Sequence, residues 1–183
     1  EAAAVARAVD RYVELTIAIR ALTSEIERYR DDHQGPLVAR ASELFPRLTL
    51  GRYAGLSVDF GDQDRPVLRA LRGDRELLDV EALSDGTRDQ LYLALRLATI
   101  ERWVDGGREP LPLVLDDTFV HFDSDRSRAA LGVLGELSPK IQVLLFTHHD
   151  RMVDLAREAV PTGRLRVHTL ERAPVARAPA PAG

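Results

Sequence analysis

The chain has 183 residues, of which 45% are hydrophobic, so it is long enough to enclose one hydrophobic core. It has no cysteine, which excludes disulfides and thiolate metal sites, and it has no apolar run of the ~18 residues that a membrane-spanning helix needs. The formal net charge of -4 excludes a surface that is basic throughout, but it is compatible with a local basic patch. We therefore expect a cytoplasmic protein with no membrane segment.

Residues 1–34 have the hydrophobic pattern of a coiled-coil helix. Apolar residues recur at alternating spacings of three and four over four heptads: Val5, Ala8, Tyr12, Leu15, Ile19, Leu22, Ile26 and Tyr29. The alternative is an ordinary amphipathic helix packed on a globular core, but the apolar stripe of such a helix is wider. Gly35 and Pro36 interrupt the pattern, so we expect a separate lobe at residues 37–171 and a disordered tail at 172–183.

The lobe is predicted to have an α/β fold. We expect helices at 37–45, 87–104, 125–137 and 152–159, and strands at 48–50, 56–60, 67–68, 77–80, 111–115, 141–146 and 164–170. The continuous apolar runs at 111–115 and 141–146 are typical of buried parallel strands. Strands that alternate with helices in the second half of the lobe predict a parallel sheet.

The segment LSDGTRDQ at residues 83–90 lies where the 87–104 helix is predicted to begin. Ser84 or Thr87 can cap this helix, and Thr87 with Gln90 has the spacing of a capping box. Gly86 allows a ligand to approach the backbone, and the free N–H groups of a helix N-terminus bind anions. Taken alone, the segment fits an ordinary helix cap better than an anion site, but it is followed by further motifs.

Two acids and two histidines follow the two predicted parallel strands. Asp116 and Asp117 come directly after the 111–115 run, and His148 and His149 come after the 141–146 run. The carboxyl ends of parallel strands are where α/β sheets bind ligands. Because alternation points the two carboxylates in different directions, one can hold Mg²⁺ while the other orients or deprotonates a water. A histidine at the same edge can contact a phosphate or lie near a metal.

These segments, in this order, resemble the C-terminal lobe of the ATPase head of SMC, SbcC and RecN-like coiled-coil ATPases. LSDGT at 83–87 resembles the ABC signature, usually LSGGQ, and residues 113–117 resemble a Walker B strand. Phe122-Asp123 is placed like a D-loop and Thr147-His148 like a switch-histidine loop. TLGRY at 49–53 and the run LSDGTRDQLYLALRLA are similar to those of YhaN-like proteins. The resemblance implies the parallel-sheet lobe of a P-loop ABC-type head, with residues 1–34 as the returning coiled-coil arm.

The resemblance assigns the signature to ATP that is bound by a second head, so it implies a dimer. Ser84, Asp85, Gly86 and Thr87 are then nucleotide-binding residues, with Ser84, Gly86 and Thr87 at the γ-phosphate. Asp123 would act across the same dimer interface. Asp85 departs from the family pattern, because a small residue is usual at this position.

The resemblance assigns the strand-end residues to the chain's own ATP. Asp116 would bind Mg²⁺, Asp117 would polarise the attacking water, and His148 would contact the γ-phosphate. Asp117 stands where many relatives have Glu, and its side chain is one methylene shorter. His149 competes with His148, which is preferred because Thr147-His148 matches the Ser-His pair of the family.

The sequence has no G-x-x-x-x-G-K-[ST] loop, and its single lysine, Lys140, lies in no glycine-rich segment. In the resembling family this loop lies near the N-terminus of the same polypeptide. The resemblance therefore implies an N-terminal Walker A lobe of the parent protein as a partner, and no ATP hydrolysis by these 183 residues alone. It also implies DNA as the ultimate ligand, in repair or chromosome maintenance, and an SbcD-like nuclease as a further partner.

Two other functions remain open. A metal-dependent phosphoesterase would bind two metal ions with six residues, Asp116, Asp117, Asp123, His148, His149 and Asp150. This function leaves the 83–87 segment and the heptads unexplained. A coiled-coil interaction domain whose head has lost ATP function would account for the departures at Asp85 and Asp117.

Overall fold

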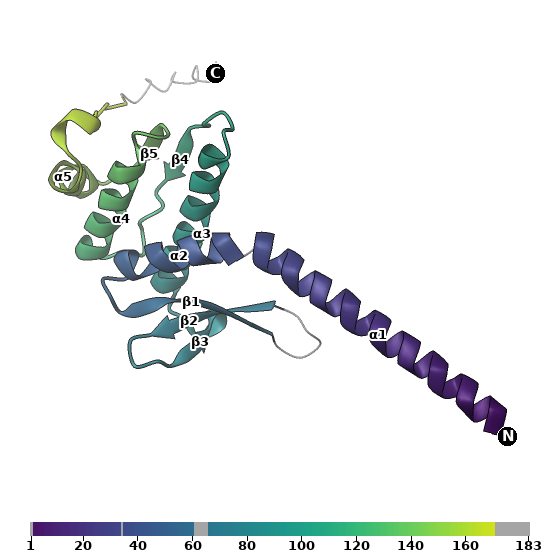
Figure 1. Cartoon of the computed structure of the whole chain (residues 1–183). Helices are drawn as coiled ribbons and strands as arrows, with labels where there is room; N and C mark the ends of the chain where they lie inside the picture. The colour runs from purple at the N-terminus through teal and green to yellow at the C-terminus, as the bar shows by residue number, and fades with distance from the viewer. Residues whose placement is uncertain (1, 34, 61–65, 171–183) are drawn as a thin grey trace, which may run out of the picture.

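The computed structural model describes residues 2–33, 35–60 and 66–170 of the chain (Figure 1). In chain order the elements are α1 (Ala2–His33), α2 (Gly35–Leu48), β1 (Tyr53–Phe60), β2 (Pro66–Arg72), β3 (Leu77–Asp79), the 3₁₀ turn η2 (Val80–Ala82), α3 (Asp85–Asp105), β4 (Leu113–Asp116), α4 (Ser124–Leu137), β5 (Val143–Phe146), α5 (Asp150–Ala159) and the 3₁₀ turn η3 (Thr162–Arg164). The tail predicted at 172–183 lies outside the described residues.

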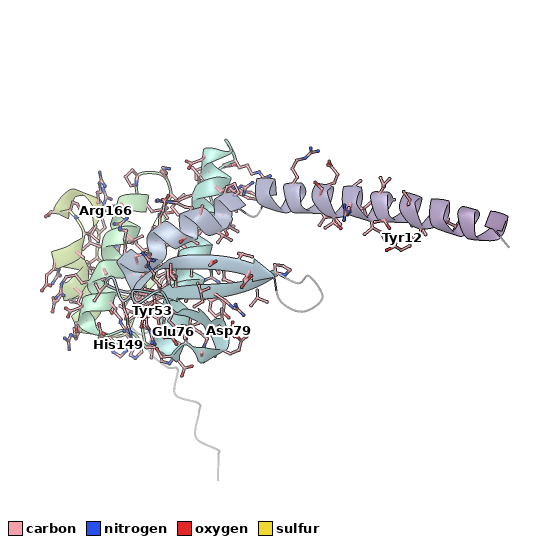
Figure 2. The ribbon with its side chains drawn as sticks, turned by 60° about the horizontal axis from the view of Figure 1, so that its bottom comes forward. Tyr12, Tyr53, Glu76, Asp79, His149 and Arg166 are labelled. Carbon is pink, nitrogen blue, oxygen red and sulfur yellow. The ribbon has the colours of Figure 1, made fainter. Side chains whose placement is uncertain are left out.

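The heptad segment forms one long helix, α1, which projects away from the other elements (Figure 1). Figure 2 shows Tyr12 on this arm, far from the rest of the molecule. Tyr12, Leu15 and Ile19 are exposed, so this part of the heptad stripe packs on no core among the described residues. The helix is confirmed, whereas its pairing in a coiled coil stays a prediction. Within the described residues, no helix combines the length and the apolar character needed to cross a membrane.

Helix α2 begins where the sequence predicted an interruption and ends later than predicted. Gly35 and Pro36 form its first turn, where a proline costs no hydrogen bond because the first N–H groups of a helix have no intrahelical partner. Phe45 and Leu48 share its buried face, so burial continues the helix to Leu48. The strand predicted at 48–50 is therefore wrong, and Leu50 instead has a φ of 55° in the turn that leads to β1.

Strands β1, β2 and β3 form an antiparallel sheet, and α2 packs against β1. The rings of Phe45 and Tyr53 lie 5.2 Å apart between their centroids, and Ser42 Oγ accepts a 2.8 Å hydrogen bond from the Leu56 amide. The opposite side of α2 carries Arg40, which forms an ion pair with Glu101 of α3. Helix α2 thus connects the arm, the antiparallel sheet and α3.

Strands β4 and β5 form the predicted parallel pair, with Leu113 opposite Val143 and Asp116 opposite Phe146. The α/β fold class is therefore confirmed. The strand predicted at 164–170 is wrong: η3 ends at Arg164, and the following residues up to 170 are irregular. Among the described strands none pairs with this segment, and a strand needs a neighbour for its backbone hydrogen bonds.

Candidate functional site

The signature segment, residues 84–87, lies at the N-terminus of α3. The helix begins at Asp85, two residues earlier than predicted, and Ser84 is its N-cap with an extended backbone. Ser84 Oγ lies 2.8 Å from Thr87 Oγ1, and Thr87 is only 1% exposed, so its side chain offers almost no surface to a ligand. Ser84 and Asp85 are exposed and Gly86 is half-buried.

The capping box predicted between Thr87 and Gln90 is wrong. Gln90 is fully buried, and its Nε2 donates a hydrogen bond to the carbonyl of Leu48, at the end of α2. The Gln90 side chain makes this tertiary hydrogen bond instead of the helix-capping bond that its sequence spacing predicted. This bond holds the second turn of α3 against the C-terminus of α2.

Gly86 lies directly against the loop that joins β4 to α4. A Cβ atom at position 86 would lie 2.7 Å from the carbonyl oxygen of His121, closer than real Cβ atoms come to any neighbour. In the same place, His121 Nδ1 lies 2.7 Å from Asp89 Oδ2. The close approach expected of Gly86 is therefore made by this protein's own backbone. No local sequence pattern indicates the His121–Asp89 pair, because 32 positions separate its members.

The two acids after the β4 run have different environments. Asp116 is the last residue of β4 and is exposed, on the same sheet face as its cross-strand neighbour Phe146. Asp117 follows with a φ of 41°, in the left-handed region that few non-glycine residues adopt. Its amide still donates a 3.0 Å hydrogen bond to the Phe146 carbonyl, so the chain turns sharply there while held to β5. Asp116 is therefore exposed at the end of the strand, whereas Asp117 lies in the turn that follows it.

Asp117, His148 and His149 form what we call the strand-end cluster. His148 Nδ1 lies 2.7 Å from Asp117 Oδ2, and an ionised carboxylate only accepts, so the imidazole donates this bond. This hydrogen bond lowers the pKa of the Asp117 carboxyl below its ordinary value. Asp117 Oδ1 is buried and has no hydrogen-bond partner in the described part of the chain. Together the residues provide a fixed anion with one unused acceptor.

Asp123 caps α4. Its Oδ1 accepts a 2.9 Å hydrogen bond from the Arg126 amide, and its Oδ2 lies 3.5 Å from Arg126 Nε. The Asp123 side chain is nevertheless largely exposed. The Arg126 guanidinium also approaches Gly86, at 3.7 Å from a Cβ built there. Asp123 is thus near the signature segment, while Asp117 and His148 form a second group at the strand ends.

Comparisons with known proteins bear on the fold of the chain, and no family model matches it. The protein YhaN of Bacillus subtilis (strain 168), itself uncharacterized, is 33% identical over 146 residues, which are 79% of this chain and 14% of YhaN. An SMC ATPase chain, from work on ATP-driven dimerization and DNA-stimulated activation, superimposes with a TM-score of 0.58 at 18% identity, over 70% of this chain and 77% of the other. The Pyrococcus furiosus Smc head, bound to the C-terminal domain of ScpA, gives 0.55 at 20% identity, over 76% and 35%.

The chain has the fold of an SMC-type ATPase head and is related to YhaN. The resemblance inferred from the ordered motifs is therefore confirmed. This head spans only about a seventh of the length of YhaN, since 14% of that protein is covered.

One face of the parallel pair in this SMC-type head is uncovered. Val114, Leu144 and Phe146 point to the same side and are 54%, 37% and 43% exposed. Parallel sheets are normally covered on both faces. The face that carries Asp116 therefore lacks a layer within the described residues.

The donor set at the strand ends fits Mg²⁺. Mg²⁺ prefers oxygen ligands and is usually held by one or two carboxylates. Asp116 offers an exposed carboxylate at the end of β4, and the unpartnered Asp117 Oδ1 is an acceptor that a metal-bound water can satisfy. The imidazoles of His148 and His149 are not ligands that Mg²⁺ prefers.

Proposed function

We propose that this chain is the signature, Walker B, D-loop and switch-histidine part of an ATP-hydrolysing SMC-type head. The observation that carries the proposal is the hydrogen bond between Asp117 and His148 beside Asp116, at the carboxyl edge of two parallel strands. Phosphoryl transfer to water needs positioned charge more than covalent chemistry, and this edge positions three polar side chains.

In this proposal Asp116, Asp117 and His148 each have one task. Asp116 holds Mg²⁺, which when bound neutralises phosphate charge. Asp117 remains ionised because His148 donates to it, so its carboxylate orients and polarises the attacking water. His148 uses Nδ1 for this bond, which leaves Nε2 to face the γ-phosphate. The backbone of Asp117 is left-handed, and the Asp117 carboxylate contacts the His148 ring.

The signature segment would act on ATP held by a second head. Ser84, Asp85 and Gly86 are accessible at the N-terminus of α3, where free N–H groups favour an anion. The buried Thr87 hydroxyl contacts the Ser84 hydroxyl and would hold it in place. Asp123, exposed beside this segment, would reach across the dimer interface.

The phosphate-binding loop would come from an N-terminal Walker A lobe of the same parent protein. Lys140, the single lysine, is engaged in an ion pair with Asp105 at 2.9 Å. The uncovered face of Val114, Leu144 and Phe146 is a surface on which such a lobe can complete the sheet sandwich. The small share of YhaN that the chain spans also supports this assignment.

ATP hydrolysis tests the proposal. The chain is mixed with an N-terminal segment of its parent that carries a GK[ST] loop, and phosphate release is measured. We expect turnover by the mixture and none by the chain alone, and we expect Asp117→Asn to lower kcat about 10²- to 10⁴-fold. Asp125→Asn, an exposed acid of α4, is the matched control and keeps full activity. Robust turnover by the chain alone contradicts the split site, and full activity of Asp117→Asn contradicts the role of Asp117.

The covering lobe is tested by co-elution of the two segments in size-exclusion chromatography. Leu144→Asp places a charge in the middle of the uncovered face and is expected to abolish co-elution. Leu111→Asp carries the same change at an exposed leucine that precedes β4, and is expected to have no effect. Equal co-elution of both variants would show that the lobe binds elsewhere.

DNA is proposed as the ligand that acts on the assembled head, and an SbcD-like nuclease as a partner at the base of α1. Support for DNA comes from the fold shared with an SMC ATPase described as activated by DNA; the net charge of -4 adds none. Duplex DNA should raise turnover of the assembled dimer. Unchanged turnover over a DNA titration at low salt would exclude this role.

The same proteins and activity assays distinguish the two other functions from the proposed ATPase. Among the described residues, the group that could hold a metal contains only three of the six residues that a phosphoesterase would use: Asp117, His148 and His149. Metal-stimulated phosphatase activity without ATP, lost in Asp116→Ala, would favour that enzyme. Stable assembly with the Walker A lobe but no hydrolysis would favour an interaction domain that has lost ATP function.

A further inference from the structure

His149 has no task in the proposed ATPase, yet it lies within the strand-end cluster. Consecutive side chains along an extended chain point to opposite sides, but the rings of His148 and His149 have centroids only 3.8 Å apart. His149 is the N-cap of α5 and gives no side-chain hydrogen bond to that helix. Its imidazole is therefore held beside His148 without a capping role.

The cluster has the composition of a transition-metal site. Asp117, His148 and His149 each offer one donor atom, and the three donor atoms lie within 4.8 Å of one another. Two imidazoles and one carboxylate suit Zn²⁺ and its neighbours, whereas Mg²⁺ prefers oxygen alone. Asp117 and His149 also line the same surface depression, with Thr118, Phe146 and Met152.

The contact between Asp117 and His148 already brings two of these donor atoms together, because His148 Nδ1 lies 2.7 Å from Asp117 Oδ2. A neutral imidazole can carry its proton on either ring nitrogen, so a proton moved from Nδ1 to Nε2 leaves both Nδ1 and Oδ2 able to bind one ion. Asp117 Oδ1 has no hydrogen-bond partner in the described part of the chain.

Metal binding requires a small movement of these side chains towards one another. Around a tetrahedral ion with bonds of about 2.0–2.1 Å, donor atoms lie roughly 3.3 Å apart. Donor atoms that are now up to 4.8 Å apart must therefore approach each other by up to about 1.5 Å. The His148 side chain is 68% exposed, so its ring can rotate without disturbing the core. Asp117 is already fixed by its backbone bond to β5.

We propose that Asp117, His148 and His149 form a binding site for one transition-metal ion such as Zn²⁺, distinct from the Mg²⁺ position at Asp116. One consequence rests on the proposed function: an ion bound there takes Asp117 and His148 away from ATP hydrolysis. Zn²⁺ therefore inhibits the assembled ATPase, and Mg²⁺ does not displace it.

Metal binding is measured first on the chain itself, by calorimetry with Zn²⁺ and by the visible absorption of Co²⁺. We expect one ion per chain, with affinity lowered at least about tenfold in His148→Ala and in His149→Ala. His168→Ala, which removes an exposed histidine outside the cluster, is the control and binds as the wild type does. Unfolding curves of the variants establish that each is folded. No saturable binding below about 1 mM, or equal losses in all three variants, overturns the site.

Inhibition is then measured on the assembled head. Zn²⁺ should lower turnover of the wild type, whereas the turnover of His149→Ala with Zn²⁺ should equal the turnover of the same variant without Zn²⁺. Equal inhibition of both proteins overturns the inhibitory consequence. Absence of turnover in any assembly instead contradicts the proposed function, and the calorimetric result on the chain stands independently of it.

Discussion

Replacing Gly86 by alanine tests the contact between the signature segment and the β4–α4 loop. The added Cβ would lie 2.7 Å from the His121 carbonyl oxygen, so the backbone of one element must move. Overpacking of this kind costs about 1–3 kcal/mol, while alanine recovers about 0.4–1 kcal/mol through the unfolded chain. We expect a net loss of about 1–2 kcal/mol, which for a domain of this size lowers Tm by roughly 2–8 °C.

Gly132→Ala is the matched control for this variant. Gly132 is in the interior of α4, and a Cβ built there has no neighbour within 4 Å. Here alanine should raise stability by about 0.5–1 kcal/mol, because only the cost of glycine in a helix is removed. Both variants are measured by thermal unfolding followed by circular dichroism. If Gly86→Ala is stabilised as much as Gly132→Ala, the close packing of α3 on the loop is refuted.

Two further predictions concern the core and the strand-end cluster. Leu91→Ala, at a fully buried position of α3, should lower the free energy of unfolding by about 2–5 kcal/mol, whereas Leu22→Ala on the exposed arm should change it by less than about 0.5 kcal/mol. In His148→Ala the pKa of Asp117 should rise towards its ordinary value in a ¹³C NMR titration. Because the folded-state pKa is lowered, the stabilisation by this pair is full above pH 3.8 and disappears as pH falls further, and His148→Ala should abolish that pH dependence. An unshifted Asp117 resonance would contradict the hydrogen bond.

Local sequence patterns predicted the elements that carry the strand-end residues. The apolar runs before Asp116 and before His148 placed both at the same edge, because parallel strands present their carboxyl ends together. The pairing of Asp117 with His148 follows from that arrangement. The helix after the signature was likewise recognisable from its polar start and long apolar periodicity.

Tertiary contacts account for what the patterns missed. Gln90 forms a hydrogen bond with Leu48, 42 positions away, and therefore does not form the helix-capping bond that its sequence spacing predicted. The β-like spacing at 48–50 was overridden by burial of Leu48 on the helical face of α2. Gly86 fits an anion loop by sequence, but its packing on His121 depends on how α3 meets a loop more than 30 residues later.

The uncovered face of β4 and β5 also bears on how the protein persists in a cell. Among the described residues, β4 and β5 each have one unpaired edge and share an exposed apolar face, which is an aggregation hazard until another segment covers it. In the proposed assembly, maturation of this lobe and docking of its partner are then a single event. Substitutions at Leu144 or Phe146 should therefore reduce the amount of intact protein through proteolysis and precipitation. The rate of ATP hydrolysis per folded molecule should change less than this amount does.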